Sequence, residues 1–207
     1  MFSIRVEISI RMNETSVSLL AQACDDGGGA SWERLAAIYS PLLRQWTARY
    51  QLQPSDVDDL VQEVLIAVSR ELPEFRHSGR TGAFRKWLRT ILVHRLQNFW
   101  RSQQRRPVRV GTSSVLKQLA ELEDDTSSAS RMWDADHDRH VLSSLLDDIR
   151  PRFEPATWDA FQRQMFRGEK GKAVASELGM SLKAVQLAKS RVLQALRSQA
   201  AGLIDCA

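Results

Sequence analysis

The chain has 207 residues, which is long enough for one large domain or two small ones, and its formal net charge is +4. Its cysteines, Cys24 and Cys206, lie near opposite ends with no histidine at metal-ligand spacing, which supports neither a disulfide framework nor a zinc site. No apolar run approaches the roughly 18 residues that span a bilayer, and the N-terminus lacks a signal-peptide layout, so we expect a cytoplasmic protein without a membrane partner.

The N-terminal residues differ in pattern from the rest of the chain. Apolar and polar side chains alternate from Phe2 to Arg11, which is the period of a strand, but we find no partner strand. One hypothesis is that Met12 is the true start, and we build no function on the residues before it.

Two helices are predicted before residue 70. Apolar residues recur at helical spacing from Trp32 to Trp46, and Pro41 predicts a break or kink between two short helices. Farther on, Ser55 precedes Asp58 in a capping-box pattern at the start of a second, very regular helix. Its apolar stripe is Val57, Leu60, Val61, Val64, Leu65 and Val68.

Residues 76–82 have loop composition, and another amphipathic helix is predicted after them. Its apolar stripe is Phe84, Trp87, Leu88, Ile91, Leu92, Leu96 and Phe99. From Arg76 to Arg109 there are ten Lys or Arg and no Asp or Glu, which indicates a polyanionic partner. Basic side chains beside an exposed Trp100 would suit a phosphate backbone and unstacked bases. The alternatives are a solvated basic face and a membrane-surface helix, the latter disfavoured because the stripe continues a three-helix core pattern.

Residues 107–131 are interpreted as a flexible linker, because they combine a polar stretch, one weak helix and an acidic, serine-rich piece. The carboxylates from Glu121 to Asp138 are opposed only by Arg131, in contrast to the basic block before them. An amphipathic helix is predicted at about residues 133–149.

The C-terminal segment AVASELGMSLKAVQLAKSRVL has the pattern of a helix-turn-helix. Ala175 is small where two helices cross, Gly179 can take the left-handed conformation of a tight turn, and Ser181 can cap the second helix. On that helix Gln186 is suited to adenine and Arg191 to guanine or phosphate. Many helical hairpins place Ala and Gly similarly, but the surrounding charge favours phosphate contacts. The basic residues there are Arg163, Arg167, Lys170, Lys172, Lys183, Lys189, Arg191 and Arg197.

The helix at residues 57–68 carries the opposite charge on its polar side. Asp56, Asp58, Asp59, Gln62 and Glu63 lie off the apolar stripe. By itself this pattern is an ordinary solvated acidic face. Beside a DNA-binding surface it would suit a protein that docks on a basic protein and on nucleic acid together.

Three segments in this order carry a family resemblance: DVDDLVQEVLIAVSRELPEF, GAFRKWLRTILVHRLQNFWRSQQRR and the helix-turn-helix. The chain resembles a sigma factor of bacterial RNA polymerase, of the extracytoplasmic-function (ECF) type within the sigma-70 family, over about residues 31–106 and 158–197. The resemblance implies an all-α fold of two small helical domains, residues 12–106 and 132–207, joined by a flexible linker. The second domain would contain the helix-turn-helix.

Three residue sets follow from the resemblance. The docking set, which in the family contacts the clamp helices of the large subunit of core RNA polymerase, is Asp58, Asp59, Leu60, Gln62 and Glu63. The minus-ten set, which would recognise and open that promoter element and hold an extruded base, is Arg76, Arg80, Arg85, Arg89, Gln97, Asn98, Trp100 and Arg101. The minus-thirty-five set, which would read duplex DNA, is Lys172, Ser181, Lys183, Ala184, Gln186, Leu187, Ser190 and Arg191.

The sequence departs from the family at several reading positions. Asn98 stands where Asp is usual and His94 where Asn is usual. In the recognition helix, Ala184, Leu187 and Ala188 stand where Thr, Ser and Arg are common. The promoter preference of the family therefore does not transfer to this chain.

Two other classes of function compete with this interpretation. A stand-alone helix-turn-helix regulator would bind duplex operator DNA without polymerase, but it leaves the acidic face unexplained. An enzyme acting on nucleic acid would need a nucleophile, a supported carboxylate pair or a metal cluster, and we find none of these. His137 and His140 imitate a ligand pair, yet among acids near a helix start we expect them to be solvated. We therefore expect no catalysis, no metal and no cofactor.

The acidic linker would let the two domains span a promoter spacer. From its charge alone, it is also a candidate binding segment for an anti-sigma factor, a further possible partner besides core RNA polymerase and promoter DNA.

Overall fold

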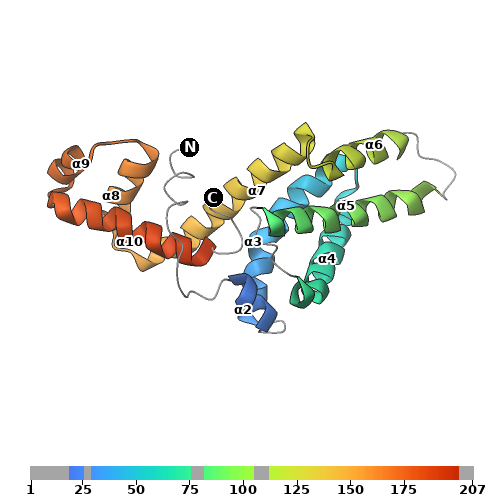
Figure 1. The fold of residues 1–207 in the computed structure, drawn as a ribbon, viewed down its shortest axis with the longest axis horizontal. Coiled ribbons are helices and arrows are strands. Elements are labelled where there is room, and N and C mark those ends of the chain that lie inside the picture. Colours follow the sequence, from blue (N-terminus) through green and yellow to red (C-terminus); the bar gives the residue numbers. More distant parts are fainter. Residues whose placement is uncertain (1–18, 26–28, 76–81, 105–111, 201–207) are drawn as a thin grey trace. The chain divides into compact units, whose positions relative to one another are not determined.

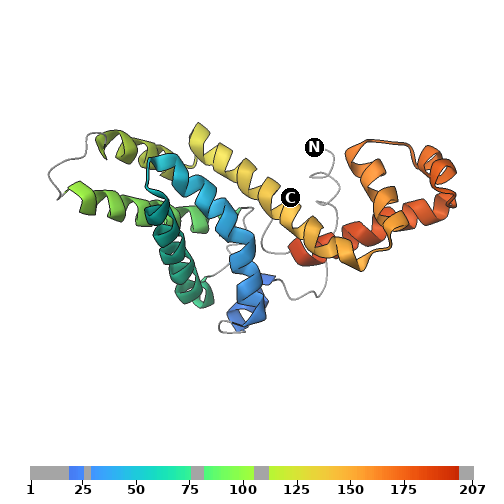
Figure 2. The same ribbon diagram turned by 180° about the vertical axis from the view of Figure 1, so that it is seen from behind.

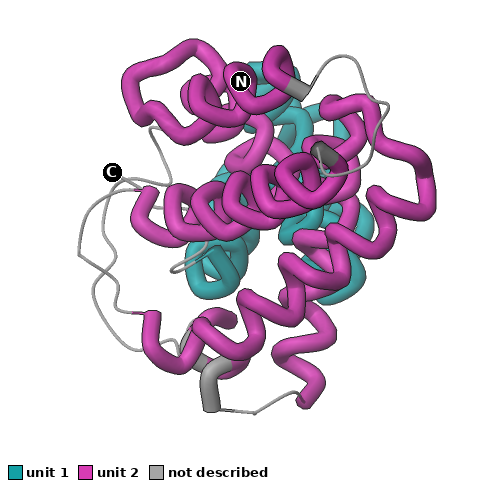
Figure 3. The backbone as a smooth tube through the Cα atoms, turned by 90° about the vertical axis from the view of Figure 1, so that its right-hand side faces the viewer, with its two compact units in different colours: residues 1–18, 142–207 teal, residues 19–141 magenta. Residues whose placement is uncertain are grey.

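The computed structural model describes residues 19–25, 29–75, 82–104 and 112–200. Within these ranges the chain forms helices and short connections and no strand, which confirms the all-α fold class. The alternating N-terminal segment, residues 2–11, lies outside them. The chain divides into an N-terminal unit, residues 19–141, and a C-terminal unit whose described part is residues 142–200 (Figure 3).

The N-terminal unit is a helical bundle (Figure 1 and Figure 2). Its helices are α2 (Leu19–Asp25), α3 (Ala30–Thr47), α4 (Pro54–Glu71), α5 (Ala83–Gln104), α6 (Thr112–Glu123) and the first half of α7 (Ser128–Ile149). α3 packs against α4, α4 against α5, and α5 against α6. The expected stripes face this core, which includes Leu42, Leu43, Leu60, Val64, Phe84, Leu88, Leu92 and Leu96.

Two local predictions are wrong, one for the middle of α3 and one for the start of α4. α3 continues through Pro41 as one helix of 18 residues, although a proline inside a helix costs roughly 3 kcal/mol. Buried residues on both sides of the proline, Ile38 and Leu42 among them, supply packing that offsets this cost. α4 begins at Pro54 rather than with a Ser55 capping box, because a proline at the first helical position has no N–H that needs a cap.

The segment interpreted as a flexible linker contains regular structure. α6 packs on α5 and buries Val115, Leu119 and Leu122. α7 starts after Ser127, whose hydroxyl accepts a hydrogen bond from the Ser130 backbone N–H at 2.9 Å. The N-terminal unit thus extends to residue 141, whereas the sequence analysis ended its first domain at residue 106.

The C-terminal unit is built on α8 (Pro155–Phe166), α9 (Gly171–Leu178) and α10 (Leu182–Ala200), after a short 3-10 turn (Arg150–Arg152). α8 and α9 both pack against α10, and the buried contact includes Ala160, Val174, Ala175, Val185 and Ala188. Gly179 has a φ of +63°, the left-handed conformation that ends α9, and the Ser181 hydroxyl accepts the Ala184 N–H at the start of α10.

Candidate polymerase and nucleic-acid interfaces

The docking set lies on α4, and its polar members share an exposed face. Asp58, Asp59, Gln62 and Glu63 are exposed, and Asp58 forms an ion pair with Arg44 of α3. Leu60 differs from them, since it is only 2% exposed and packs in the core. Its role is therefore to hold α4 in place rather than to contact a partner directly.

An apolar side chain that the sequence analysis missed extends this face. Ile66 lies four residues after Gln62 and is 49% exposed. Residues four apart are neighbours on a helix surface, so the α4 face combines carboxylates, an amide and one exposed aliphatic group. The signal in the sequence was that Ile66 does not belong to the apolar stripe of α4.

The first half of α5 presents its basic side chains to carboxylates of the same unit. Arg85 pairs with Asp138 at 3.1 Å and with Asp134 at 3.3 Å. Arg89, only 4% exposed, pairs with Asp125 and lies 3.6 Å from Asp134. Lys86 also bonds to Asp125, and this hydrogen bond is the main cause that lowers the pKa of Asp125. We expected Arg85 and Arg89 to face DNA, and in the structure they face the chain's own acids.

Buried residues anchor α7 beside these ion pairs. Trp133 is fully buried, its Nε1 donates a hydrogen bond to the Arg85 carbonyl at 3.1 Å, and its ring meets Trp46 edge-on. His137 is also fully buried, four residues later on the same helix face. The first half of α7 is therefore part of the core of the N-terminal unit.

Both histidines of DADHDRH have defined partners, so the expectation that they are solvated is wrong. Nδ1 of His137 lies 3.2 Å from Asp138 and its Nε2 lies 3.1 Å from the Tyr39 hydroxyl. This arrangement fits a neutral ring that donates to the carboxylate and accepts from the hydroxyl. Burial is the main cause that lowers the pKa of His137, while Asp138 opposes that shift. His140 donates from Nε2 to the Ile38 carbonyl at 2.6 Å.

The second half of α5 remains accessible at two positions of the minus-ten set. Asn98 and Arg101 are exposed, and Gln97 is half-buried and bonds to Glu123 at 3.3 Å. Trp100 is only 4% exposed, which corrects the expectation of an exposed stacking surface. It lies four residues after Leu96 and so continues the buried stripe. Arg76 and Arg80 lie outside the described residues.

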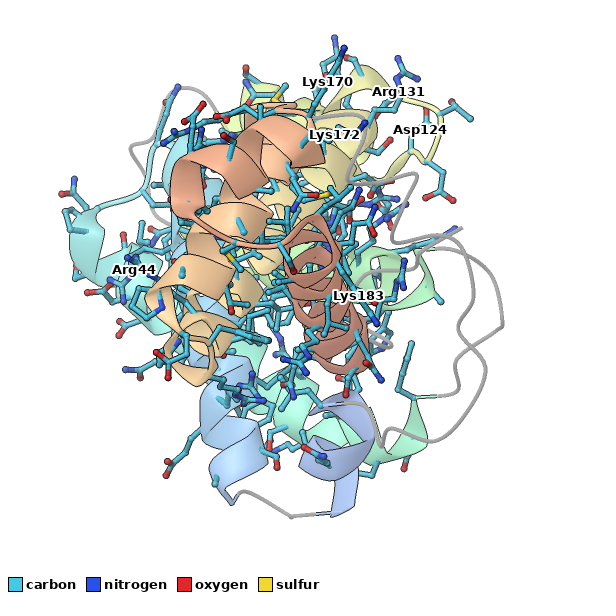
Figure 4. All side chains as sticks on the ribbon, turned by 90° about the vertical axis from the view of Figure 1, so that its left-hand side faces the viewer. Arg44, Asp124, Arg131, Lys170, Lys172 and Lys183 are labelled. Carbon is cyan, nitrogen blue, oxygen red and sulfur yellow. The ribbon has the colours of Figure 1, made fainter. Side chains whose placement is uncertain are left out.

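The minus-thirty-five set lies on the C-terminal unit, where Figure 4 labels two of its members, Lys172 on α9 and Lys183 on α10. Lys172 lies in the first turn of α9, and the other members lie at or just before the start of α10 and along its first half. All are exposed except the half-buried Ala184: Lys172, Ser181, Lys183, Gln186, Leu187, Ser190 and Arg191. Leu187 is an apolar side chain, 45% exposed, on the side of α10 away from the core.

One basic residue of this unit has a structural role instead. Arg163 is buried, donates from Nε to Glu169 at 2.8 Å and also bonds to Glu177. Its hydrogen bond to Glu169 is the main cause that raises the pKa of Arg163, and the same bond lowers the pKa of Glu169. Arg163 therefore ties α8 to α9 and does not belong to the exposed basic surface.

In the part of the chain that the structure describes, no group of three or more His, Cys, Asp or Glu side chains is arranged to hold a metal ion. Over the same residues, each helix is too short or too polar to cross a membrane.

Comparisons with known proteins find similarity to sigma factors of RNA polymerase. Residues 35–106 match sigma-70 region 2. The ECF RNA polymerase sigma factor ShbA of Streptomyces griseus is 28% identical over 202 residues, covering 92% of this chain and 99% of ShbA. The RNA polymerase sigma factor NccH of Alcaligenes xylosoxydans is 28% identical over 185 residues, covering 89% of this chain and 93% of NccH.

Proposed function

We infer that this chain, which belongs to the sigma-70 family of RNA polymerase sigma factors and within it to the ECF type, binds core RNA polymerase and directs promoter-specific initiation. The observation that carries this inference is the similarity to two sigma factors along nearly the whole chain, with the region 2 match falling on the N-terminal unit. Proteins of this kind supply binding and promoter opening rather than bond chemistry. Its place of action is then the cytoplasm, where the polymerase works.

The α4 face is the proposed docking surface for the polymerase. Asp59, Gln62 and Glu63 are exposed there, and Ile66 adds an apolar contact at their side. Carboxylates of this kind steer association with a basic partner surface and fix its register, while a buried apolar contact adds affinity. This combination supports a protein partner for α4, and the negative charge disfavours nucleic acid at this face.

The accessible end of α5 is the proposed site for the minus-ten element. Arg101 can bond to phosphate and Asn98 to a base edge. Because Trp100 is buried, base stacking there falls to side chains other than Trp100. We expect Arg101→Ala to weaken promoter opening while polymerase binding is retained.

The first half of α10 is the proposed reading surface for the minus-thirty-five element. The Gln186 amide is suited to a bidentate pair of hydrogen bonds with the edge of adenine, and Arg191 is suited to guanine or phosphate. Leu187 is suited to the methyl group of thymine, since apolar side chains make that contact in the major groove.

An anti-sigma factor that binds residues 121–130 stays a prediction.

The test is to mix the purified chain with bacterial core RNA polymerase, then follow gel filtration and transcription from genomic fragments. We expect co-elution and new, specific start sites. Gln62→Ala with Glu63→Ala should weaken polymerase binding, so that less of the chain co-elutes, and should leave duplex binding unchanged. Gln118→Ala with Glu121→Ala, the same residue types exposed on α6, is the matched control and should co-elute normally. Tight duplex binding without co-elution would favour a stand-alone regulator instead.

A further inference from the structure

The turn between α6 and α7 covers part of the basic side of α5. Asp125 in this turn bonds to both Lys86 and Arg89. Carboxylate and phosphate oxygens make the same charge-assisted hydrogen bonds to ammonium and guanidinium groups. Lys86 and Arg89 are therefore bound by an acid of the same chain in the manner in which they would bind a nucleic-acid backbone.

The carboxylates that pair with α5 are held in place in two different ways, those on α7 firmly and the one in the turn before α7 weakly. Asp134 and Asp138 lie on α7, which Trp133 and His137 anchor in the core. Asp125 and Lys86, in contrast, keep side-chain exposures of 48% and 60%. Exposed ion pairs contribute little to stability and weaken with salt, whereas burying a tryptophan contributes several times more.

We propose that Lys86 and Arg89 form a masked binding site for a nucleic-acid backbone, and that the turn carrying Asp125 must lift from α5 before the backbone can bind. The exchange replaces one carboxylate by phosphates and leaves α7 in place, so the fold of the unit is kept. Arg85 stays with Asp134 and Asp138 and takes no part. The proposal rests on the proposed function only in taking promoter DNA as the natural ligand.

The neighbouring Asp124 provides a matched control. Its carboxylate accepts hydrogen bonds from the backbone N–H and hydroxyl of Thr126, at 2.9 Å and 2.8 Å, and it contacts no basic side chain of α5 in the described ranges. Asp125→Asn and Asp124→Asn therefore remove the same charge from the same turn. Only the first removes the acid that covers Lys86 and Arg89.

The experiment measures binding of the full chain to a fluorescently labelled single-stranded oligonucleotide of mixed sequence, by anisotropy at 50 to 300 mM salt. Two additional phosphate contacts on single-stranded DNA steepen the slope of log affinity against log salt by about 1.4. We expect Asp125→Asn to show this steeper slope and roughly tenfold tighter binding at the lowest salt, and Asp124→Asn to remain within twofold of the unmodified chain. Lys86→Gln added to Asp125→Asn should remove at least half of the gain.

Hydrogen exchange provides a second readout on the unmodified chain. Adding the same oligonucleotide should speed exchange at residues 124–127 and leave residues 133–141 protected. Equal slopes for the two Asn variants, or exchange at the turn that is unchanged or slower, would overturn the proposal. A chain that initiates transcription with core polymerase but shows equal slopes keeps its proposed function and loses only the masked site.

Discussion

The first half of α5 and the first half of α10 are both rich in basic residues, yet the structure treats them in opposite ways. On α5, Arg85, Lys86 and Arg89 are each paired with a carboxylate of α7 or of the turn before it. On α10, Lys183 and Arg191 are exposed, and no carboxylate in the described part of the chain pairs with either of them. Counting basic residues therefore does not locate a nucleic-acid surface, because acids of the same fold already hold those of α5.

The difference lies in what binding DNA would displace. An exposed Arg191 releases only mobile counterions when it meets a phosphate, and that release drives the association. Arg89 is almost fully buried and can meet a phosphate only after Asp125 has left it, while Asp134 of α7 stays beside it. A phosphate must therefore take the place of that carboxylate, because a buried arginine whose ion pair is broken without a replacement is an uncompensated charge, which is costly.

The largest expected effect tests whether α7 belongs to the N-terminal unit. Trp133→Ala removes a fully buried ring and its hydrogen bond to Arg85, and should lower the free energy of unfolding by about 3 to 5 kcal/mol. Urea unfolding followed by circular dichroism measures it. Met132→Ala, the exposed neighbour, should cost less than about 0.5 kcal/mol. Equal stabilities of the two variants would mean that the first half of α7 is not part of the core of the N-terminal unit.

The second prediction contrasts two arginines, Arg89 on α5 and Arg191 on α10. Arg89→Ala should destabilise the chain by roughly 2 kcal/mol, because it removes the buried cation between Asp125 and Asp134 and leaves these acids with only Lys86 and Arg85, and should not change duplex binding. Arg191→Ala should leave stability within about 0.5 kcal/mol and reduce the salt slope of duplex binding by about 0.9. Both quantities are measured on both variants by urea unfolding and anisotropy. Equal effects of the two changes would remove the contrast between α5 and α10.

The parts of this structure that follow from local patterns could be predicted from the sequence. The stripes at 57–68 and 84–99 became buried faces of α4 and α5, because helical periodicity is a property of neighbouring residues. Gly179 ends α9 with the left-handed turn that its lack of a side chain allows. The minus-thirty-five residues Lys183, Gln186, Leu187, Ser190 and Arg191 lie exposed on α10 for the same local reason.

Contacts between distant residues could not be predicted in this way. Arg85 and Asp138 are 53 residues apart, and no period in the sequence links them. The opposite charges of the two segments were evident, but charge does not say whether an acid meets a base of its own chain or of a partner. A usable signal was the spacing of Trp133, His137 and Val141, four residues apart, which marks a helix face that packs on something.

The third prediction uses His137 as a probe of this buried contact. Burial lowers the pKa of His137 in the folded chain below its ordinary value, so the unfolded chain binds the proton more readily. Stability should therefore be full above about pH 6.5, the ordinary pKa that the unfolded chain retains, and should fall as the pH drops below it. Urea unfolding at pH 7.5 and at pH 5.5 measures this difference in stability. Asp138 and Asp134 act against the lowered pKa, and Arg85 acts with burial.

Two variants separate His137 from the other titrating groups. His137→Gln should flatten the dependence between pH 7.5 and pH 5.5, whatever its effect on stability at a single pH. His140→Gln, which removes the ring bonded to the Ile38 carbonyl, should retain it. An unchanged pH dependence in His137→Gln would mean that His137 is not held neutral by the contact between α7 and α3.

The smallest expected effect concerns what an exposed recognition helix reads. Leu187 lies between Lys183 and Arg191 on α10, and an apolar side chain there is suited to a thymine methyl group. Replacing thymine by uracil at one position of the mapped minus-thirty-five element removes only that methyl. Because one buried methyl contributes about 0.8 kcal/mol, the change should weaken binding about fourfold. Anisotropy with the two duplexes measures the ratio.

The variant series then identifies the reader of that methyl. Leu187→Ala should bind the thymine duplex about as weakly as the unmodified chain binds the uracil duplex, and should not distinguish the two. Gln194→Ala, an exposed polar position farther along α10, should keep the fourfold ratio. If every thymine can be replaced without effect on the unmodified chain, Leu187 does not read the base, and the specificity of α10 must come from its polar side chains alone.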